Sequence, residues 1–124
     1  MINVVCGIRS TGRICTDLAV ALEEKGHEVK IAYGRGTVPE QFKKYSIRIG
    51  KDFDIKLHAA KARIFDSSGL GSKSATEDFI NWVKEYNPDV IHLHNIHGYY
   101  INIKVLFAYL KTCGKKIIWT LHDC

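Results

Sequence analysis

The fold is decided by the N-terminal part of the chain, which reads INVVCGIRSTGRICTDLAVALEEKGHEVKIAYGRG over residues 2–36. This stretch begins with the apolar run Ile2–Cys6, which is typical of a buried strand and ends in a glycine-rich loop. Apolar residues then recur at positions 14, 18 and 22, the spacing of an amphipathic helix. A second apolar run, Val29–Tyr33, completes a strand–helix–strand unit, which places two parallel strands in one sheet.

The helix of this unit has recognisable ends. Ser10 or Thr11 can cap its first turn through a side-chain hydroxyl. Gly26 stands where a residue in the left-handed conformation would end the helix. We therefore expect a helix between the two apolar runs.

The remainder of the chain continues this alternation of strands and helices. We expect an edge strand at Ser46–Ile49, a helix at Ile55–Phe65, a helix that begins with the capping box Ser74–Glu77, a strand at Val90–His94, a helix at Ile101–Cys113 and a strand at Lys116–Leu121. The order predicts an α/β fold: a Rossmann-like, three-layer α/β/α domain on a mostly parallel sheet. A chain of 124 residues has room for one such domain.

The composition is that of a globular protein that carries excess positive charge. Hydrophobic residues make up 46% of the chain and charged residues 25%, so a packed core is expected and general disorder is not. The net charge of +5 suits an anionic partner such as phosphate, nucleic acid or lipid headgroups, and equally suits a solvated surface. No nucleic-acid-binding motif accompanies the charge, so nucleic acid is not an expected partner.

A cytoplasmic protein with reduced thiols is expected. No apolar run approaches the roughly 20 residues of a membrane-spanning helix. The N-terminus also lacks the basic start and long apolar stretch of a signal peptide. The cysteines form no Cys-x-x-Cys pair and lie among apolar residues, so we expect them to act as small core residues: Cys6, Cys15, Cys113 and Cys124.

Polar residues and glycines gather where the predicted strands end. The ends of the strands lead into Gly7–Arg13, Gly34–Gly36, Asn95–Tyr99 and His122. In a parallel sheet the carboxyl ends of the strands share one edge, and ligands bind beyond that edge. We therefore expect the functional site there.

The loop after the first strand is suited to a diphosphate. Gly7 and Gly12 allow close approach of the backbone, and the helix that follows offers free N–H groups and the positive end of its dipole. The loop is not a Walker P-loop, because Arg13 and Ile14 stand where lysine and a hydroxyl are required. Nor is it a dinucleotide fingerprint, because Arg35 occupies the place of the acidic residue. Glycines that serve only a tight turn remain the alternative.

The histidines divide into weaker and stronger candidates. By alternation His92 and His94 share a face of their strand, where each on its own is more often structural. A metal site formed with His97 is disfavoured because the spacing is not that of known zinc sites, and no metal or other cofactor is expected. His122, beside Asp123 at a strand end, is the stronger catalytic candidate. A structural hydrogen bond from His122 to a neighbouring loop is its alternative.

A wider set of segments is distinctive in combination: Asn3, Ser10–Ile14, Ala32–Gly36, Gly69–Ser72, Asn87–Tyr100 and Trp119–Cys124. Together they resemble bacterial sugar transferases of glycosyltransferase family 4, which build exopolysaccharide, capsule or colanic-acid-type polymers. The resemblance runs the length of the chain and covers the N-terminal part of such an enzyme. It implies the N-terminal, acceptor-side domain of a GT-B fold, in which two Rossmann-like domains face each other across the active site.

The resemblance also implies roles for individual residues. The donor diphosphate would be contacted by Ser10, Thr11, Gly12 and Arg13. His122 would approach the transferred sugar as the catalytic residue. The acceptor side would be lined by Asn95, His97 and Tyr99. The implied reaction moves a sugar from a nucleotide-sugar to a saccharide or lipid-linked saccharide with retention of anomeric configuration, and without a divalent metal.

The family's second domain, which binds the nucleotide-sugar, has no counterpart in residues 1–124. We therefore expect a truncated protein that has no transferase activity alone. The basic, amphipathic segment Ile55–Phe65 could rest on anionic lipid at the inner face of the plasma membrane, or could simply pack on the sheet. The alternative to an enzyme is a stand-alone Rossmann-like module that binds a nucleotide or phosphosugar without catalysis.

Overall fold

The computed structural model describes residues 1–50, 73–96 and 100–122. Within these residues the strands form one five-stranded sheet of order β3-β2-β1-β4-β5. The strands are β1 (Ile2–Asn3), β2 (Ile31–Tyr33), β3 (Ser46–Arg48), β4 (Val90–Leu93) and β5 (Lys116–Trp119). Every pair of neighbours is parallel. The predicted α/β class and parallel sheet are therefore confirmed.

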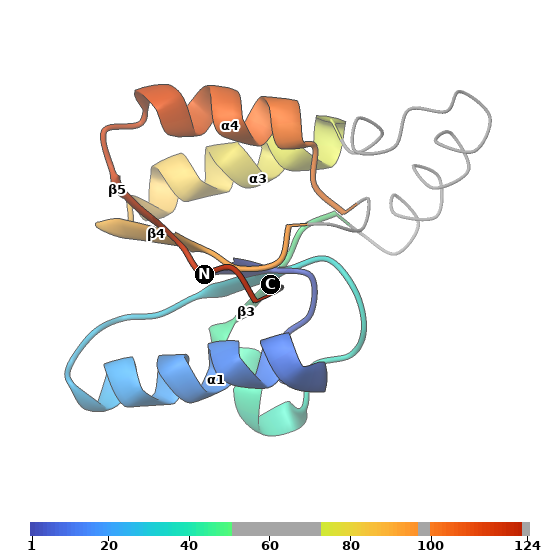
Figure 1. Cartoon of the computed structure of the whole chain (residues 1–124), viewed down its shortest axis with the longest axis vertical. Helices are drawn as coiled ribbons and strands as arrows, with labels where there is room; N and C mark the ends of the chain where they lie inside the picture. The colour runs from blue at the N-terminus through green and yellow to red at the C-terminus, as the bar shows by residue number, and fades with distance from the viewer. Residues whose placement is uncertain (51–72, 97–99, 123–124) are drawn as a thin grey trace.

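Helices cover both faces of the sheet and complete a three-layer, Rossmann-like arrangement (Figure 1). One face carries α1 (Arg9–Glu24) and the short 3-10 helix η1 (Glu40–Tyr45). The opposite face carries α3 (Lys73–Tyr86) and α4 (Ile103–Thr112). The predicted helix at Ile55–Phe65 lies outside the described residues.

The core is divided between the two faces. The larger cluster packs under α3 and α4 and includes Ile91 and Leu93 of β4. Because side chains alternate along a strand, His92 and His94 point to the face that carries α1. The smaller cluster lies on that face and includes Cys6 and Cys15. Burial raises the pKa of the Cys6 thiol to about 11 and that of Cys15 to about 12, so both are the core thiols that were predicted.

Helix α1 was predicted correctly, but its apolar stripe is not its buried face. The buried positions are Gly12, Cys15, Thr16 and Ala19. Ile14 and Leu18 are 39% and 37% exposed. Small residues on the inner face let the helix lie close to the sheet, and the Thr16 hydroxyl is satisfied by donating to carbonyl oxygens of its own helix.

The two ends of α1 differ from each other in how well they were predicted. Neither Ser10 nor Thr11 caps the helix, because it begins at Arg9 with Ile8 as its cap residue and no side-chain cap. Gly26 ends the helix as expected, with φ +90°. Its N–H donates to Glu23 O (2.9 Å) and that of His27 donates to Leu22 O (3.0 Å), the pattern of a Schellman motif.

Most other predicted boundaries are correct within two or three residues. Ser46–Arg48 is the expected edge strand, but β1 stops at Asn3 instead of Cys6. Ser74 lies inside α3, which begins at Lys73, so it is not the predicted cap. Helix α4 begins behind Asn102, whose side chain accepts the Val105 N–H at 3.1 Å.

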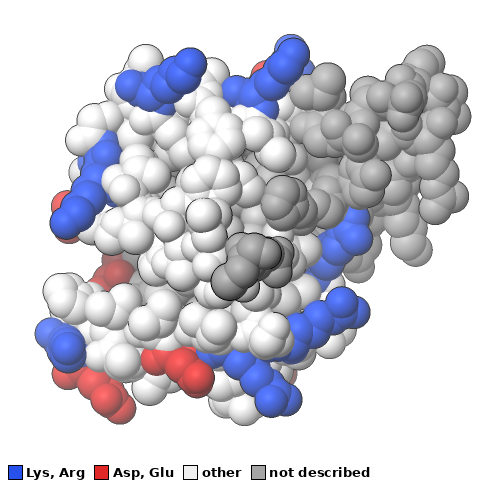
Figure 2. Space-filling view, in the orientation of Figure 1, with Lys and Arg blue, Asp and Glu red and all other residues white. Residues whose placement is uncertain are grey.

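The charged side chains of the described residues are dispersed over the face that Figure 2 draws. Figure 2 shows Lys and Arg spread around the periphery of the face in view. Two lysines of η1 form ion pairs, Lys43 with Glu40 (2.8 Å) and Lys44 with Glu23 (2.9 Å). In the described parts of the chain, no helix has the length and apolar character needed to cross a membrane.

Candidate functional site

A single buried side chain, that of Asn3, connects the loops that follow β1 and β4. Its Nδ2 donates to Val5 O at 2.7 Å and to Thr11 Oγ1 at 3.2 Å. Its Oδ1 accepts the backbone N–H of Asn95 at 3.0 Å. Asn3 is completely buried, so these bonds replace all contact with water. The predicted phosphate loop and the predicted acceptor segment are therefore neighbours.

The loop between β1 and α1 has a fixed and unusual backbone. Gly7 has φ +77°, and a Cβ there would lie 2.9 Å from atoms of both Phe42 and Pro39. Arg9 adopts φ +58°, a left-handed conformation that is uncommon for residues other than glycine. Such residues often occur where function requires a particular chain direction.

The N-terminus of α1 has no side-chain cap. Ile8 supplies no acceptor, and the first turn contains no acidic residue. The first amides of a helix have no partner within the helix itself and carry the positive end of the helix dipole. An anion bound there would satisfy them.

The four predicted phosphate-loop residues are placed differently. Ser10 and Arg13 are exposed, whereas Thr11 is half-buried and bonded to Asn3. Gly12 is buried, and a Cβ on it would lie 3.1 Å from Gly7 N and from a Val5 methyl group. The absence of a side chain at Gly12 thus allows α1 to pack closely against the segment that follows β1. This is a structural role, in line with the alternative that the glycines of this loop serve a tight turn and not a ligand. The side chains of Ser10 and Arg13 remain accessible to a ligand.

Three histidines and a threonine form two parallel contacts across β4 and β5. His92 Nε2 lies 2.6 Å from Thr120 Oγ1, and His94 Nδ1 lies 2.9 Å from His122 Nε2. The rings of His92 and His94 are 4.0 Å apart between centroids, which confirms that they share a face. The strand register, with Leu93 opposite Trp119, brings these residues together.

His94 is the most constrained member of this group. It is 2% exposed. The backbone N–H of His94 donates to Ile2 O at 2.9 Å, and the backbone carbonyl oxygen of His94 accepts the Trp119 indole N–H at 3.0 Å. Burial, and secondarily the nearby His92 and His122, lowers the pKa of His94 to about 3, so the ring is neutral at pH 7. Burial also lowers the pKa of His92.

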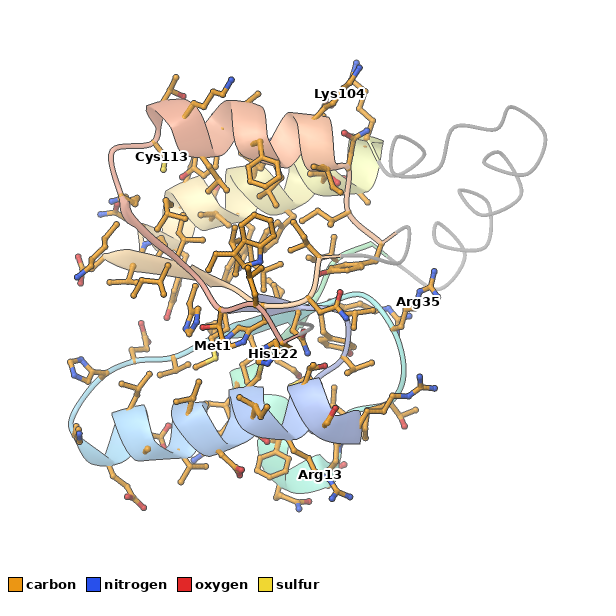
Figure 3. The ribbon with its side chains drawn as sticks, in the orientation of Figure 1. Met1, Arg13, Arg35, Lys104, Cys113 and His122 are labelled. Carbon is orange, nitrogen blue, oxygen red and sulfur yellow. The ribbon has the colours of Figure 1, made fainter. Side chains whose placement is uncertain are left out.

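His122 lies at the same edge of the sheet as the loop after β1. It is half-buried, and its contact with His94 connects it through Asn95 and Asn3 to Thr11. Figure 3 shows His122 in the centre of the molecule, with Arg13 at the start of α1. Because all the strands are parallel, His122 and the loop after β1 both lie beyond the carboxyl ends of their strands.

Two further predicted site residues, His97 and Tyr99, lie outside the described residues. Asn95 is half-buried and contributes its backbone N–H to Asn3 and its carbonyl oxygen to the Tyr100 hydroxyl (2.7 Å). Within residues 1–50, 73–96 and 100–122, no three histidine, cysteine or acidic side chains are arranged to hold a metal ion.

Sequence reasoning gave no role to Tyr100, Gly34 or the side chain of Asn3. Tyr100 is 1% exposed. A Cβ added to Gly34 would lie 2.1 Å from the Cβ of Tyr100. The available signal was a polar residue, Asn3, within an otherwise apolar strand. Such a residue is buried only when its hydrogen bonds are satisfied.

Comparison with known proteins agrees with this architecture. The family model described as Glycosyltransferase Family 4 matches residues 11–124. The match includes most of α1, the segment that follows β4, and His122, and it begins after β1 and the loop that follows it. Searches among curated proteins and among solved structures find no match. The parallel, Rossmann-like sheet and the extent of the family match together show that this chain belongs to glycosyltransferase family 4.

Proposed function

We propose that the chain is the N-terminal, acceptor-side half of a retaining transferase that makes surface polysaccharide. In this proposal a sugar moves from a nucleotide-sugar to a saccharide or lipid-linked saccharide. A second domain supplies most of the contacts to the nucleotide, so residues 1–124 alone do not catalyse transfer. Family membership supports the class of donor and acceptor in general terms.

The observation that carries the proposal is the placement of two unlike groups at one sheet edge. The uncapped N-terminus of α1, with Arg13 beside it, offers positive charge and N–H donors. His122 offers an imidazole, connected to the same edge through His94. Negative charge develops on the departing diphosphate in the transition state, and fixed donors stabilise it there.

The donor side can be tested by titrating the ¹⁵N-labelled chain with UDP, GDP and uridine. We expect the diphosphates to shift the amide resonances of Ser10–Arg13 and uridine to leave them unchanged. Arg13→Gln should weaken binding about 5-fold, or about 1 kcal/mol. The control is Lys104→Gln, which removes an exposed charge on α4 and should leave the affinity unchanged. Equal effects of the two variants would contradict the assignment of Arg13.

The catalytic role of His122 is tested separately, in the transferase with both domains present. We expect His122→Ala to lower kcat while the shifts caused by UDP persist. A variant that transfers sugar as fast as the original protein would favour the alternative, a binding module without catalysis. Sugar transfer by residues 1–124 alone would contradict the proposed need for a second domain.

We also propose a cytoplasmic location with peripheral attachment to the inner face of the plasma membrane. The segment proposed to contact the membrane is Ile55–Phe65. That segment lies outside the described residues, and its sequence alone supports the idea. Sedimentation with neutral and anionic vesicles at low and high salt tests it. Equal recovery with both kinds of vesicle would contradict it.

A further inference from the structure

The contact between His94 and His122 occupies a defined nitrogen on each ring. It joins His94 Nδ1 to His122 Nε2, with the ring planes 13° apart. One of these nitrogens must carry the proton and the other must accept it. In either case Nε2 of His122 is occupied, so Nδ1 is the nitrogen of His122 that remains for a ligand.

The burial of His94 decides the direction of the bond. Its Nε2 is buried and has no hydrogen-bond partner among the described residues. A neutral His94 with its proton on Nε2 would bury an N–H donor without an acceptor, and such donors are rarer than acceptors left without a donor. The arrangement that avoids this has the proton on Nδ1 of His94, donated to Nε2 of His122.

We propose that His94 is a positioning residue that donates from Nδ1 to Nε2 of His122 and thereby leaves Nδ1–H of His122 as a hydrogen-bond donor to the transferred sugar. The proposal rests on the proposed function, because it takes His122 to be the group that meets the sugar. To the proposed function it adds three statements. His122 is the Nδ1–H tautomer, its Nδ1 is the atom that meets the sugar, and His94 determines both.

The surroundings of His94 support a ring that stays neutral and in place. The charged or titratable groups around it are His92 on β4, His122 after β5 and the amino group of Met1 at the start of β1. Each of these would be positively charged when protonated, which opposes a proton on His94. The backbone bonds to Ile2 and Trp119 fix the main chain from both sides.

The test is an imidazole ¹⁵N correlation spectrum of the chain at neutral pH, which distinguishes the two tautomers without any substrate. We expect both His94 and His122 to carry the proton on Nδ1, against the Nε2–H preference of free imidazole. His27, exposed after α1, should show that free preference and serves as the internal reference. Nε2–H on His122 in the unmodified chain would overturn the proposal by itself.

Two substitutions separate positioning from simple structural support. His94→Leu removes the donor, and His122 should then revert to the tautomer ratio of His27. His94→Asn keeps an N–H near the position of Nδ1 and should restore the Nδ1–H tautomer. An unchanged His122 in a folded His94→Leu protein would overturn the proposal. Because these spectra need no donor or acceptor, they stand whether or not His122→Ala lowers transfer, so the two proposals fail independently.

Discussion

At the scale of single residues, the site depends on polar side chains that are buried and hydrogen-bonded to groups on neighbouring elements. Asn3 is completely enclosed and joins the loops after β1 and β4 through its carboxamide. His94 is nearly as enclosed and contacts His122. Removing one partner from such a network leaves the other partner desolvated, which costs more than the bond itself contributes.

Asn3→Ala should lower the free energy of unfolding by about 1–3 kcal/mol, because the Asn95 N–H loses its acceptor. Urea unfolding measures this loss. The control Asn81→Ala replaces an exposed asparagine on α3 and should change stability by less than about 0.5 kcal/mol. A loss from Asn3→Ala no greater than that of the control would show that Asn3 does not connect the loops.

Gly34→Ala should cost about 2–3 kcal/mol of stability or prevent folding, because the new Cβ would lie 2.1–2.4 Å from Tyr100 atoms in a packed core. Gly26→Ala provides the comparison. Nothing lies within 4 Å of a Cβ at Gly26, so only its left-handed conformation (φ +90°) is penalised, at about 1 kcal/mol. Thermal unfolding of the two variants should therefore give clearly different midpoints, and equal midpoints would count against the Tyr100 contact.

At the scale of elements, the sheet ends in a strand with exposed apolar side chains. All four residues of β5 are exposed, including Ile117, Ile118 and Trp119 at 37%, 40% and 46%. Within the described residues β5 pairs only with β4, so its other edge keeps backbone groups available. Uncovered edges of this kind promote pairing between chains.

The chain should therefore associate with itself in a concentration-dependent way, and Ile118→Lys should reduce this association. Sedimentation velocity over a range of concentrations measures it. The matched control is Val20→Lys, which adds the same charge at a comparably exposed position (37%) on α1. If both variants reduce association equally, added charge is the cause and β5 is not the contact.

At the scale of the whole molecule, stability should decline as the pH falls. The pKa of His94 is about 3 in the fold against 6.5 when exposed, so below about pH 6.5 the unfolded chain binds a proton that the folded chain refuses. Each such proton costs up to about 1.4 kcal/mol per pH unit. The Met1 amino group, with its pKa lowered from 8.0 to about 6 by burial, acts in the same direction at higher pH.

Urea unfolding between about pH 7 and pH 5 should accordingly show a falling free energy of unfolding. His94→Asn removes one titrating group. It should therefore reduce the dependence of the unfolding free energy on pH by up to about 1.4 kcal/mol per pH unit, the contribution of one proton. His27→Asn makes the same substitution at an exposed histidine and is the matched control. Equal slopes in the His94 and His27 variants would mean that His94 is not kept neutral by the fold.

The sequence allowed prediction of the strands and helices, which local hydrophobic patterns control. It did not allow prediction of side-chain contacts between strands, which the strand register controls. The strands were found because Ile31–Tyr33 is an apolar run and Val90–Leu93 is apolar except for His92, a signal that needs no tertiary information. The buried face of α1 was mistaken because small residues such as Ala19 lie inward where larger apolar ones were expected. The His94–His122 contact joins residues 28 apart and depends on how β4 and β5 pair, which no local pattern encodes.

The bonds of Asn3 also bear on how two ligands would influence each other. A nucleotide that restricts the motion of Thr11 would also restrict the carboxamide of Asn3, which donates to Thr11. Through the same carboxamide it would restrict the backbone N–H of Asn95. An acceptor that arrives second would then meet a segment whose ordering entropy has already been lost. Thermodynamic reciprocity requires the benefit to be equal in both directions. Donor and acceptor would therefore bind with positive cooperativity without touching each other.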